Sequence, residues 1–263
     1  MIPKVSVIMP SFNSCRHIEE AIYSVLNQTY QNLELLVIDG GSSDTTIELV
    51  SKISSNDFRL VYVNNINDDG PAHARQSGIE ISKGEYIAFL DADDYWLPEK
   101  IERQLKFMQD NNFQFSYTGY RSVDEEGSNL SCPVIMKGSY NFTRGLMYRG
   151  IGILTVMVER KILSKDVICS RSHFAEDYLW WLLILNNGYI AHHLNIDSAR
   201  YRNSKNSRSS NRLYHQLSLW KIYRGTLGIN FTKAFFYYSY YLINTAFNKT
   251  RIHICSYISN RPF

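Results

Sequence analysis

The sequence lacks the features that mark several common classes of protein. Its 263 residues include four widely spaced cysteines and no CxxC pair, so neither a structural zinc site nor a disulfide framework is expected. The 28 Lys and Arg residues nearly balance the 25 Asp and Glu residues, and a net charge of +3 gives no global field of the kind that marks a dedicated nucleic-acid binder. Repeats and low-complexity linkers are absent too. We therefore expect a single folded domain with a C-terminal extension.

Long hydrophobic runs are also missing. The longest uncharged stretch, Ala234 to Asn248, contains several Tyr and Asn residues. It is about fifteen residues long, short of the roughly twenty apolar residues that a spanning helix needs. The N-terminus has no charged segment followed by a long apolar one, so we expect no signal peptide. With reduced thiols, these features predict a cytoplasmic protein that can lie on a membrane rather than cross it.

Short apolar runs alternate with amphipathic segments over the first hundred residues, which is typical of a parallel sheet covered by helices. The expected strands are Val5 to Met9, Leu33 to Ile38, Leu60 to Val63, Tyr86 to Leu90, Phe115 to Tyr120, Ile153 to Val158 and Ala199 to Arg202. The expected helices are Ile18 to Leu26, a segment from about Asp44, Ala72 to Ile81, Pro98 to Asn111, Ala175 to Asn187 and the tail from Leu213. We therefore expect an α/β fold with a Rossmann-like, mostly parallel sheet in residues 1–210 and a helical tail in residues 211–263.

Three carboxylates crowd the end of one expected strand. Asp91, Asp93 and Asp94 fall within four positions, and such like charges raise one another's pKa unless a cation neutralises them. Carboxylate oxygens suit Mg²⁺ or Mn²⁺, with other positions left for water and phosphate. The alternative is an acidic turn that caps the following helix. Placement at a strand end near Asp39 favours the metal site, because ligands bind at the carboxyl ends of parallel strands.

Two further groups accompany this acidic loop. Asp39 precedes small residues that let a ligand approach the backbone closely, although a turn and a helix cap explain the Gly and Ser equally well. Arg75 lies on the first turns of an expected helix near the acidic loop and can bind a diphosphate through bidentate hydrogen bonds, whereas His73 is more often structural.

Glu176 and Asp177 open an apolar helix that contains Trp180 and Trp181. Acids in a first helical turn are expected from the helix dipole alone. The aromatic surroundings favour a sharper interpretation, because a partly desolvated carboxylate has a raised pKa and is a stronger general base.

The C-terminal third is locally basic. Residues 201–210 form a basic, Ser-rich segment that either closes over a diphosphate as a lid or is a solvated linker. Further on, aromatic residues mix with Lys221, Arg224 and Lys233, which suits a helix at a membrane interface. The alternative is a helix packed on the domain or a dimer contact.

Together these motifs resemble a known family. The run VSVIMPSFN, the stretch LLVIDGGSSDTT, the segment from Gly70 to Leu105 and the later FAEDYLWWLLI are similar to motifs of the family 2 GT-A glycosyltransferases. Bacterial enzymes that build O-antigen, capsule or teichuronic-type polysaccharides are the members we have in mind. The resemblance is strong over the first 110 residues and moderate over residues 150 to 210, and the order of the motifs is highly specific.

The resemblance implies a role for each motif. Residues 1–110 would bind the nucleotide sugar and residues 111–210 the acceptor. Asp39 would accept a hydrogen bond from uracil, Arg75 would lie near the base or diphosphate, and Asp91 would touch the ribose. Asp177 would be the catalytic base, supported by Glu176. The metal ion would be held by Asp93. The implied nucleotide-sugar contacts are Pro10, Phe12, Asn13, Asp39, Arg75, Asp91, Ala92, Asp93, Arg202, Ser207 and Ser209.

Two departures from the family pattern matter. Many members have a second acid where this chain has Gly40, so the contact made by that acid is in doubt. Many also have a His two residues after the Arg that corresponds to Arg202, where this chain has Ser204, which weakens a role for imidazole in this loop.

The chemistry implied is transfer of a hexose or N-acetylhexosamine from a UDP-sugar to an acceptor hydroxyl, with Mn²⁺ or Mg²⁺ as cofactor. One base and no opposed nucleophilic carboxylate predict a single displacement, hence inversion of the anomeric centre. The expected acceptor is a polyprenyl-diphosphate-linked saccharide at the inner face of the cell membrane, reached through a peripheral tail. The alternatives are a sugar nucleotidyltransferase, disfavoured because no Gly-rich, basic triphosphate loop follows the first strand, or an inactive nucleotide-sugar-binding protein.

Overall fold

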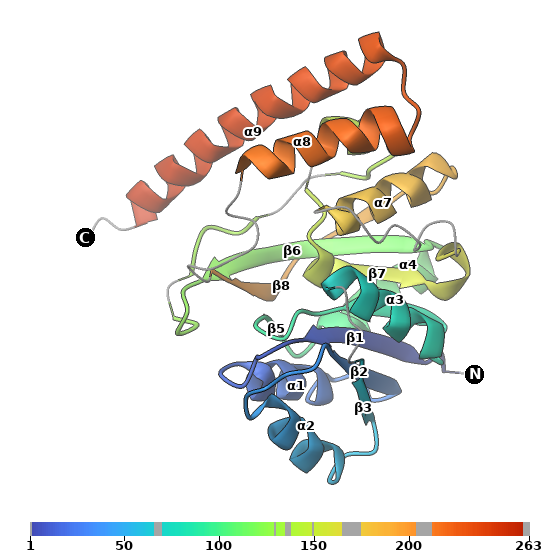
Figure 1. Ribbon diagram of the computed structural model, residues 1–263, viewed down its shortest axis with the longest axis vertical. Helices are drawn as coiled ribbons and strands as arrows, with labels where there is room; N and C mark the ends of the chain where they lie inside the picture. The colour runs from blue at the N-terminus through green and yellow to red at the C-terminus, as the bar shows by residue number, and fades with distance from the viewer. Residues whose placement is uncertain are drawn as a thin grey trace.

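The computed structural model describes residues 2–65, 70–128, 130–134, 138–148, 150–164, 175–203 and 212–259. They form one eight-stranded sheet with helices on both faces and a pair of helices at one end (Figure 1). The strands are β1 Val5–Ser11, β2 Leu33–Asp39, β3 Leu60–Asn64, β4 Tyr86–Phe89, β5 Tyr95–Trp96, β6 Phe115–Val123, β7 Val156–Glu159 and β8 His192–Arg202. The longer helices are α1 Ile18–Leu26, α2 Thr46–Ser54, α3 Pro71–Ile81, α4 Lys100–Asp110, α5 Phe142–Met147, α7 Glu176–Asn186, α8 Arg212–Lys221 and α9 Phe231–Ser259.

The sheet is parallel at one end and mixed at the other. Its order is β3-β2-β1-β4-β7-β6-β8-β5, and the first four strands run parallel. β7 is antiparallel to β4 and β6, whereas β8 runs parallel to β6. The register places Ser11 beside Asp39, so the carboxyl ends of β1 and β2 lie level. This sheet with covering helices confirms the expected α/β fold class.

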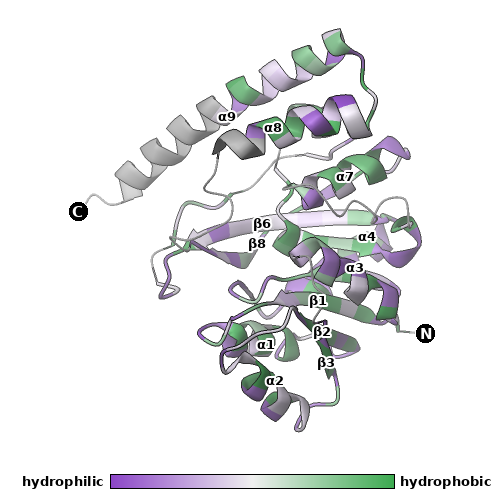
Figure 2. Ribbon diagram, in the orientation of Figure 1, coloured by the Kyte–Doolittle hydropathy of each residue, from purple (hydrophilic) through white to green (hydrophobic). Residues whose placement is uncertain are grey.

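Side-chain alternation along the strands explains the two helical layers. Val5, Val7 and Met9 of β1 point into a core shared with α1, α2 and α4. Ile8 points to the opposite face and joins a core shared with α3 and α7. Because both faces are covered, every residue of β1 and β2 is buried, and apolar side chains lie on both faces of these strands, with a few polar residues between them (Figure 2).

A close approach between α3 and the sheet depends on Gly78. A Cβ atom at this position would lie 2.5 Å from Cγ2 of Ile8 on β1. Helix α3 begins at Pro71, directly after Gly70, whose φ of 112° suits glycine. These residues therefore seat α3, and with it Arg75, close against β1.

The structure differs from the sequence-based prediction in several elements. β8 spans eleven residues rather than the four expected from Ala199 to Arg202, because its first half is polar and gives no apolar signal. The first residues of the expected strand at Ile153 form a 3₁₀ turn, Ile153–Thr155. Strand β5 and helix α5 were not predicted, since two and six residues are too short to show a period. The division at residue 110 stays a prediction, and the β4–β7 pairing joins segments on either side of it.

The tail packs on the body of the protein. A π-helical turn, Ile222–Thr226, connects α8 to the loop before α9. Leu219, Tyr223 and Ala234 of the tail share a buried cluster with Leu179 of α7 and Leu146 of α5. None of the helices within the described ranges combines the length and hydropathy needed to span a bilayer.

Candidate active site

The predicted site residues gather where the parallel strands end. Asp39 is the last residue of β2, and Asp91 follows β4 by two residues. Glu176 and Asp177 open α7, which covers the same face of the sheet as α3. Carboxylates from distant parts of the sequence are thereby brought to one edge of the sheet, as ligand sites in α/β folds require.

The loops after β1 and β2 are held together by hydrogen bonds. The buried carboxylate of Asp39 accepts from the backbone N–H groups of Gly41, at 3.0 Å, and Ser42, at 2.7 Å, and from the Ser42 hydroxyl, at 2.6 Å. The backbone N–H of Asn13 donates to Ser42 Oγ at 2.8 Å, and Asn13 adopts a left-handed φ of 47°. Phe12, next to Asn13, is exposed. The hydrogen bonds of this turn account for the position of Asp39. Its contact with the uracil base of the donor stays a prediction.

The acidic loop after β4 is electrostatically strained. Burial raises the pKa of Asp93 to about 6, and the adjacent Asp91 adds to the rise. Burial raises the pKa of Asp94 well above its usual value, and Asp93 adds to this effect. Asp94 Oδ1 accepts a hydrogen bond from the backbone N–H of Arg202 at 2.8 Å, so the end of β8 fixes the position of this carboxylate. A cation beside Asp93 and Asp91 would relieve the crowding.

The carboxylates of the acidic loop suit Mg²⁺ or Mn²⁺ bound partly by substrate and water. They do not form a metal site made wholly of protein ligands among the described residues. Among the described residues, no three His, Cys, Asp or Glu side chains are placed to hold a metal together. Mg²⁺ is commonly bound through one or two carboxylates, with substrate phosphates and water completing its shell. Asp93 and Asp91 can supply such carboxylates.

Arg75 connects the acidic loop to the helix that carries Glu176. Its guanidinium is 5 % exposed, and Nη2 donates to Asp91 Oδ1 at 2.5 Å while Nη1 donates to Glu176 Oε1 at 3.0 Å. Burial acts to lower the pKa of Arg75, but Asp91 and Glu176 outweigh it and raise that pKa above its usual value. The sequence predicted a diphosphate contact for Arg75. In the structure its two terminal nitrogens donate to two carboxylates of the protein, and the contact with a diphosphate stays a prediction.

The first turn of α7 carries the two acids expected to supply the base. Burial raises the pKa of Glu176, Arg75 opposes the rise, and the adjacent Asp177 adds to it. Asp177 is half-buried. Trp180 and Trp181 point into the sheet core, where both lie about 6 Å from Phe89 between ring centres, at 6.2 and 6.1 Å. The tryptophans therefore anchor α7 to the sheet.

Arg202 anchors the acidic loop. It is buried, and its guanidinium donates to the backbone carbonyl of Asp93 at 2.9 Å, to that of Glu125 at 2.8 Å and to the Glu20 carboxylate at 2.5 Å. The predicted contact of Arg202 with the donor stays a prediction, as do those of Pro10 and Ala92, which are buried in β1 and the acidic loop. Ser207 and Ser209 lie outside the described residues.

Comparison with known proteins identifies the family. The family model described as "Glycosyl transferase family 2" matches residues 6–168, more than half of the chain. The chain belongs to glycosyltransferase family 2.

Two relatives of this glycosyltransferase match it over most of their own length. It is 34 % identical over 232 residues to TuaG of Bacillus subtilis, whose name places it in teichuronic acid biosynthesis, covering 88 % of this chain and 92 % of that protein. It is 36 % identical over 218 residues to the Escherichia coli protein WfgD, covering 83 % and 84 %. WfgD is named a UDP-Glc:alpha-D-GlcNAc-diphosphoundecaprenol beta-1,3-glucosyltransferase.

Solved structures show the same fold at low identity. The glycosyltransferase matches Staphylococcus aureus TarS 1-349 in complex with UDP-GlcNAc with a TM-score of 0.69 and 20 % identity, covering 84 % of this chain and 64 % of that one. It matches the mannosyltransferase PcManGT of Pyrobaculum calidifontis, in complex with GDP-Man and Mn²⁺, with a TM-score of 0.67 and 19 % identity, covering 87 % and 65 %. The chain thus spans just under two thirds of each. These likenesses show the GT-A fold.

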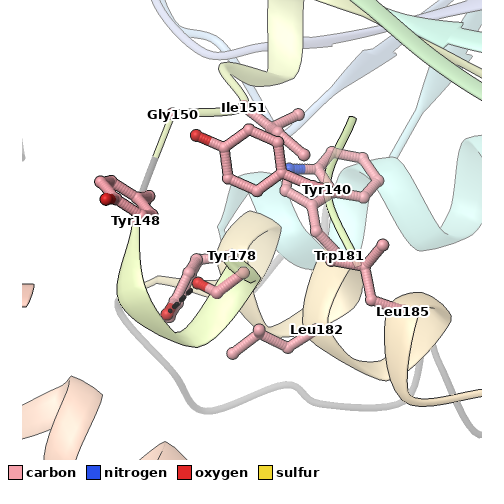
Figure 3. A pocket seen from close by; sticks show the side chains of 9 residues that line it. Tyr140, Tyr148, Gly150, Ile151, Tyr178, Trp181, Leu182 and Leu185 are labelled. Carbon is pink, nitrogen blue, oxygen red and sulfur yellow. Dashed lines mark hydrogen bonds between the residues drawn. The ribbon is translucent and has the colours of Figure 1, made fainter. Parts of the chain in front are cut away.

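A narrow crevice lies between α5 and α7 in the glycosyltransferase. Side chains from α7, from the residues that flank α5 and from Ile151 converge on it (Figure 3), including Tyr140, Trp181 and Leu185. Its volume of about 10 Å³ is the space of a single water molecule. Tyr140 Oη and Trp181 Nε1 are buried there without a hydrogen-bond partner in the described part of the chain, so a water site is the simplest function of this crevice.

Sequence reasoning missed the structural use of two arginines and the role of Glu20. The bridge from Arg75 to Glu176 joins positions 101 residues apart, and the pair of Arg202 with Glu20 joins positions 182 apart. No local pattern signals either pair. A buried arginine needs a carboxylate partner, but the sequence around Arg75 and Arg202 is polar and does not signal that either residue is buried.

Proposed function

We propose that this glycosyltransferase transfers a hexose or N-acetylhexosamine from a UDP-sugar, with inversion, to a hydroxyl of a polyprenyl-diphosphate-linked saccharide. The product would enter a surface polysaccharide of the O-antigen, capsule or teichuronic type. The names of WfgD and TuaG support this donor and acceptor chemistry. The family assignment favours sugar transfer over the alternative of a sugar nucleotidyltransferase.

The observation that carries the proposal is the Arg75 bridge. It joins the acidic loop, where the donor is expected, to the first turn of α7, where the base is expected. General base catalysis needs the base within hydrogen-bond reach of the acceptor hydroxyl while the donor is bound nearby. A rigid connection between the two sides supports that requirement.

Each residue has a distinct part in the proposed reaction. Asp177 takes the proton of the acceptor hydroxyl as that oxygen attacks the anomeric carbon and the bond to the UDP oxygen breaks. Asp93, with Asp91 beside it, would hold Mn²⁺ or Mg²⁺, which when bound neutralises charge on the departing diphosphate. Glu176 and Arg75 hold α7 against the loop. Asp39 and the loop from Pro10 to Asn13 would receive the nucleoside.

The test is transfer from a panel of UDP-sugars to a GlcNAc-diphospho-polyprenol acceptor, read by mass spectrometry, with the anomeric configuration read by NMR. Asp177→Asn should lower the transfer rate by roughly a hundred- to ten-thousand-fold, because it removes the base and keeps the shape. UDP affinity in calorimetry should barely change. Glu176→Gln keeps an oxygen that can accept from Arg75, so it should cost less.

Three outcomes would overturn parts of this assignment. If Asp177→Asn keeps near-normal transfer while Glu176→Gln abolishes it, the base is Glu176. If no UDP-sugar is consumed and UTP with a sugar phosphate yields pyrophosphate, the protein is a nucleotidyltransferase. Binding of UDP with neither reaction would indicate an inactive nucleotide-sugar-binding protein.

A further inference from the structure

Helix α9 has two different faces. Its inner face is buried against the body of the protein through Ala234 and Tyr241. Its outer face leaves Phe231, Phe235 and Phe236 exposed by 61, 59 and 57 %. The sequence left two alternatives for this helix, packing on the domain or lying on a membrane. The structure shows that packing uses only one face and leaves the other open.

The exposed rings form a continuous surface. Phe231 and Phe235 are stacked, with ring centres 6.4 Å apart, and Trp220 lies 5.7 Å from Phe231. Ile243 extends the exposed apolar surface one to two turns further along α9. We call Phe231, Phe235, Phe236 and Ile243 the outer face. Contiguous exposed apolar residues of this kind mark interaction sites rather than ordinary solvated surface.

Charge distinguishes between the partners that this surface can have. Residues 211–263 carry seven Lys or Arg and no Asp or Glu, whereas the whole chain has a net charge of +3, so residues 1–210 carry −4. Lys221, Arg224 and Lys233 of the tail are exposed. A symmetric contact between two outer faces would bring like charges together. An anionic bilayer surface offers both the opposite charge and an apolar layer for the rings.

The turn before α9 connects the tail to α7, the helix that carries the proposed base. Tyr178, directly after Asp177, donates its hydroxyl hydrogen bond to the Gly145 carbonyl at 2.9 Å and lies 2.8 Å from the hydroxyl of Tyr223. Tyr223 donates to the Leu146 carbonyl at 2.6 Å. All four residues are buried or nearly so in the cluster between α5, α7 and the tail. Movement of the tail relative to α7 would break this network.

We propose that the outer face of α9, with Lys221, Arg224 and Lys233, docks this protein on an anionic phospholipid surface. Because α9 packs on α5 and on the turn that carries Tyr223, and Tyr223 is in contact with Tyr178 of α7, docking holds the Glu176–Asp177 end of that helix at a set position relative to the bilayer. In Figure 1, α8 and α9 lie at the opposite end of the molecule from α2, so the tail meets the bilayer with the body projecting away. The docking deepens the proposed function and rests on it for the lipid-linked acceptor.

The experiment measures binding of the full chain to vesicles by sedimentation, without donor or acceptor. The vesicles are phosphatidylcholine alone or phosphatidylcholine mixed with phosphatidylglycerol. We expect binding to the mixed vesicles, weakened by salt. The double variant Phe231→Ser with Phe235→Ser should bind roughly ten- to a hundred-fold more weakly, because two inserted rings are lost. Lys221→Gln with Lys233→Gln should weaken binding by about five-fold per lysine.

Matched controls separate docking from general stickiness. Phe58→Ser removes a ring that is 93 % exposed in the loop between α2 and β3, and it should leave vesicle binding unchanged. Lys52→Gln with Lys106→Gln removes two exposed lysines from the body and should also have no effect. Circular dichroism and thermal melting verify that each variant is folded.

Three results would overturn the proposal. These are equal binding by the Phe231, Phe235 double variant, an equal loss with Phe58→Ser, or absence of vesicle binding together with a dimer that the double variant disperses. Transfer to a water-soluble short-chain acceptor tests the proposed function separately. The double variant should keep that transfer and lose transfer to acceptor embedded in vesicles. If the wild-type protein transfers sugar to neither acceptor, the proposed reaction is wrong. Vesicle binding reports on docking alone.

Discussion

Replacing Arg75 by Met tests whether this arginine holds the site together or binds the donor. The change removes the cation between Asp91 and Glu176 and keeps much of the side-chain volume. Removing one partner of a buried ion pair costs about 3–5 kcal/mol, because the remaining charge is stranded. Asp91 is 31 % exposed and Glu176 is 15 % exposed, so water recovers part of the loss at Asp91.

A second contribution lowers the expected loss of stability further. Arg75 Nε is buried with no hydrogen-bond partner among the described residues, and Met removes that unsatisfied group. We therefore expect the free energy of unfolding to fall by about 3 kcal/mol, at the low end of the range. Adding Glu176→Gln removes one stranded charge, so the double variant should recover roughly 1–2 kcal/mol of that loss.

Urea unfolding of the single and double variants, compared at constant m-value, measures these changes. The matched control is Arg103→Met, which breaks an exposed pair with Glu99 at 3.5 Å and should cost at most about 0.5 kcal/mol. Transfer should fall through kcat more than through the KM for the UDP-sugar. If Arg75→Met instead leaves stability intact and abolishes UDP binding, Arg75 binds the nucleotide sugar, and its bridge between Asp91 and Glu176 does not stabilise the fold.

Three further predictions concern the metal, a buried lysine and the seat of α3. EDTA should abolish transfer and Mn²⁺ or Mg²⁺ should restore it; full activity in chelator would remove the metal role given to Asp93. Burial lowers the pKa of Lys100 from 10.5 to about 7. Between these two pH values the unfolded chain binds a proton that the native chain lacks. The free energy of unfolding should therefore rise with pH across that window, by up to roughly 5 kcal/mol. Lys100→Met should flatten that slope in urea titrations at several pH values, and an unchanged slope would contradict the burial argument. Gly78→Ala should lower stability by about 1–3 kcal/mol in spite of better helix propensity, because the new Cβ would lie 2.5 Å from Ile8. Gly225→Ala, which meets nothing within 4 Å, is the comparison.

The central strands and helices could be predicted because their residues alone carry the signal. The apolar run from Leu33 to Ile38 is buried on both faces, and Ile101, Leu105 and Met108 recur at helical spacing in α4. Pairing between strands that are far apart in the sequence gave no such signal. The first half of β8 is polar, and it is a strand because β6 supplies its hydrogen-bond partners.

The candidate site divides in the same way. Asp39, Asp91 and Asp93 could be placed at strand ends from local pattern, and the structure brings their loops to one edge of the sheet. The partners of Arg75 could not be predicted, because Glu176 is 101 residues away and either a phosphate or a carboxylate satisfies a guanidinium. Only the folded chain shows which of them the protein itself provides.

The covering of α7 by the tail has a consequence for the order in which the protein is made. Leu179 and Tyr178 are closed off by residues as late in the chain as Ala234 and Tyr241. A nascent chain that has emerged as far as residue 203 holds the eight strands of the described sheet, yet its helix α7 has one apolar side bare. Residues 219–241 therefore complete the core over α7 and add the aromatic outer face of α9 together, so the covering of α7 and the outer surface form in the same stage of folding.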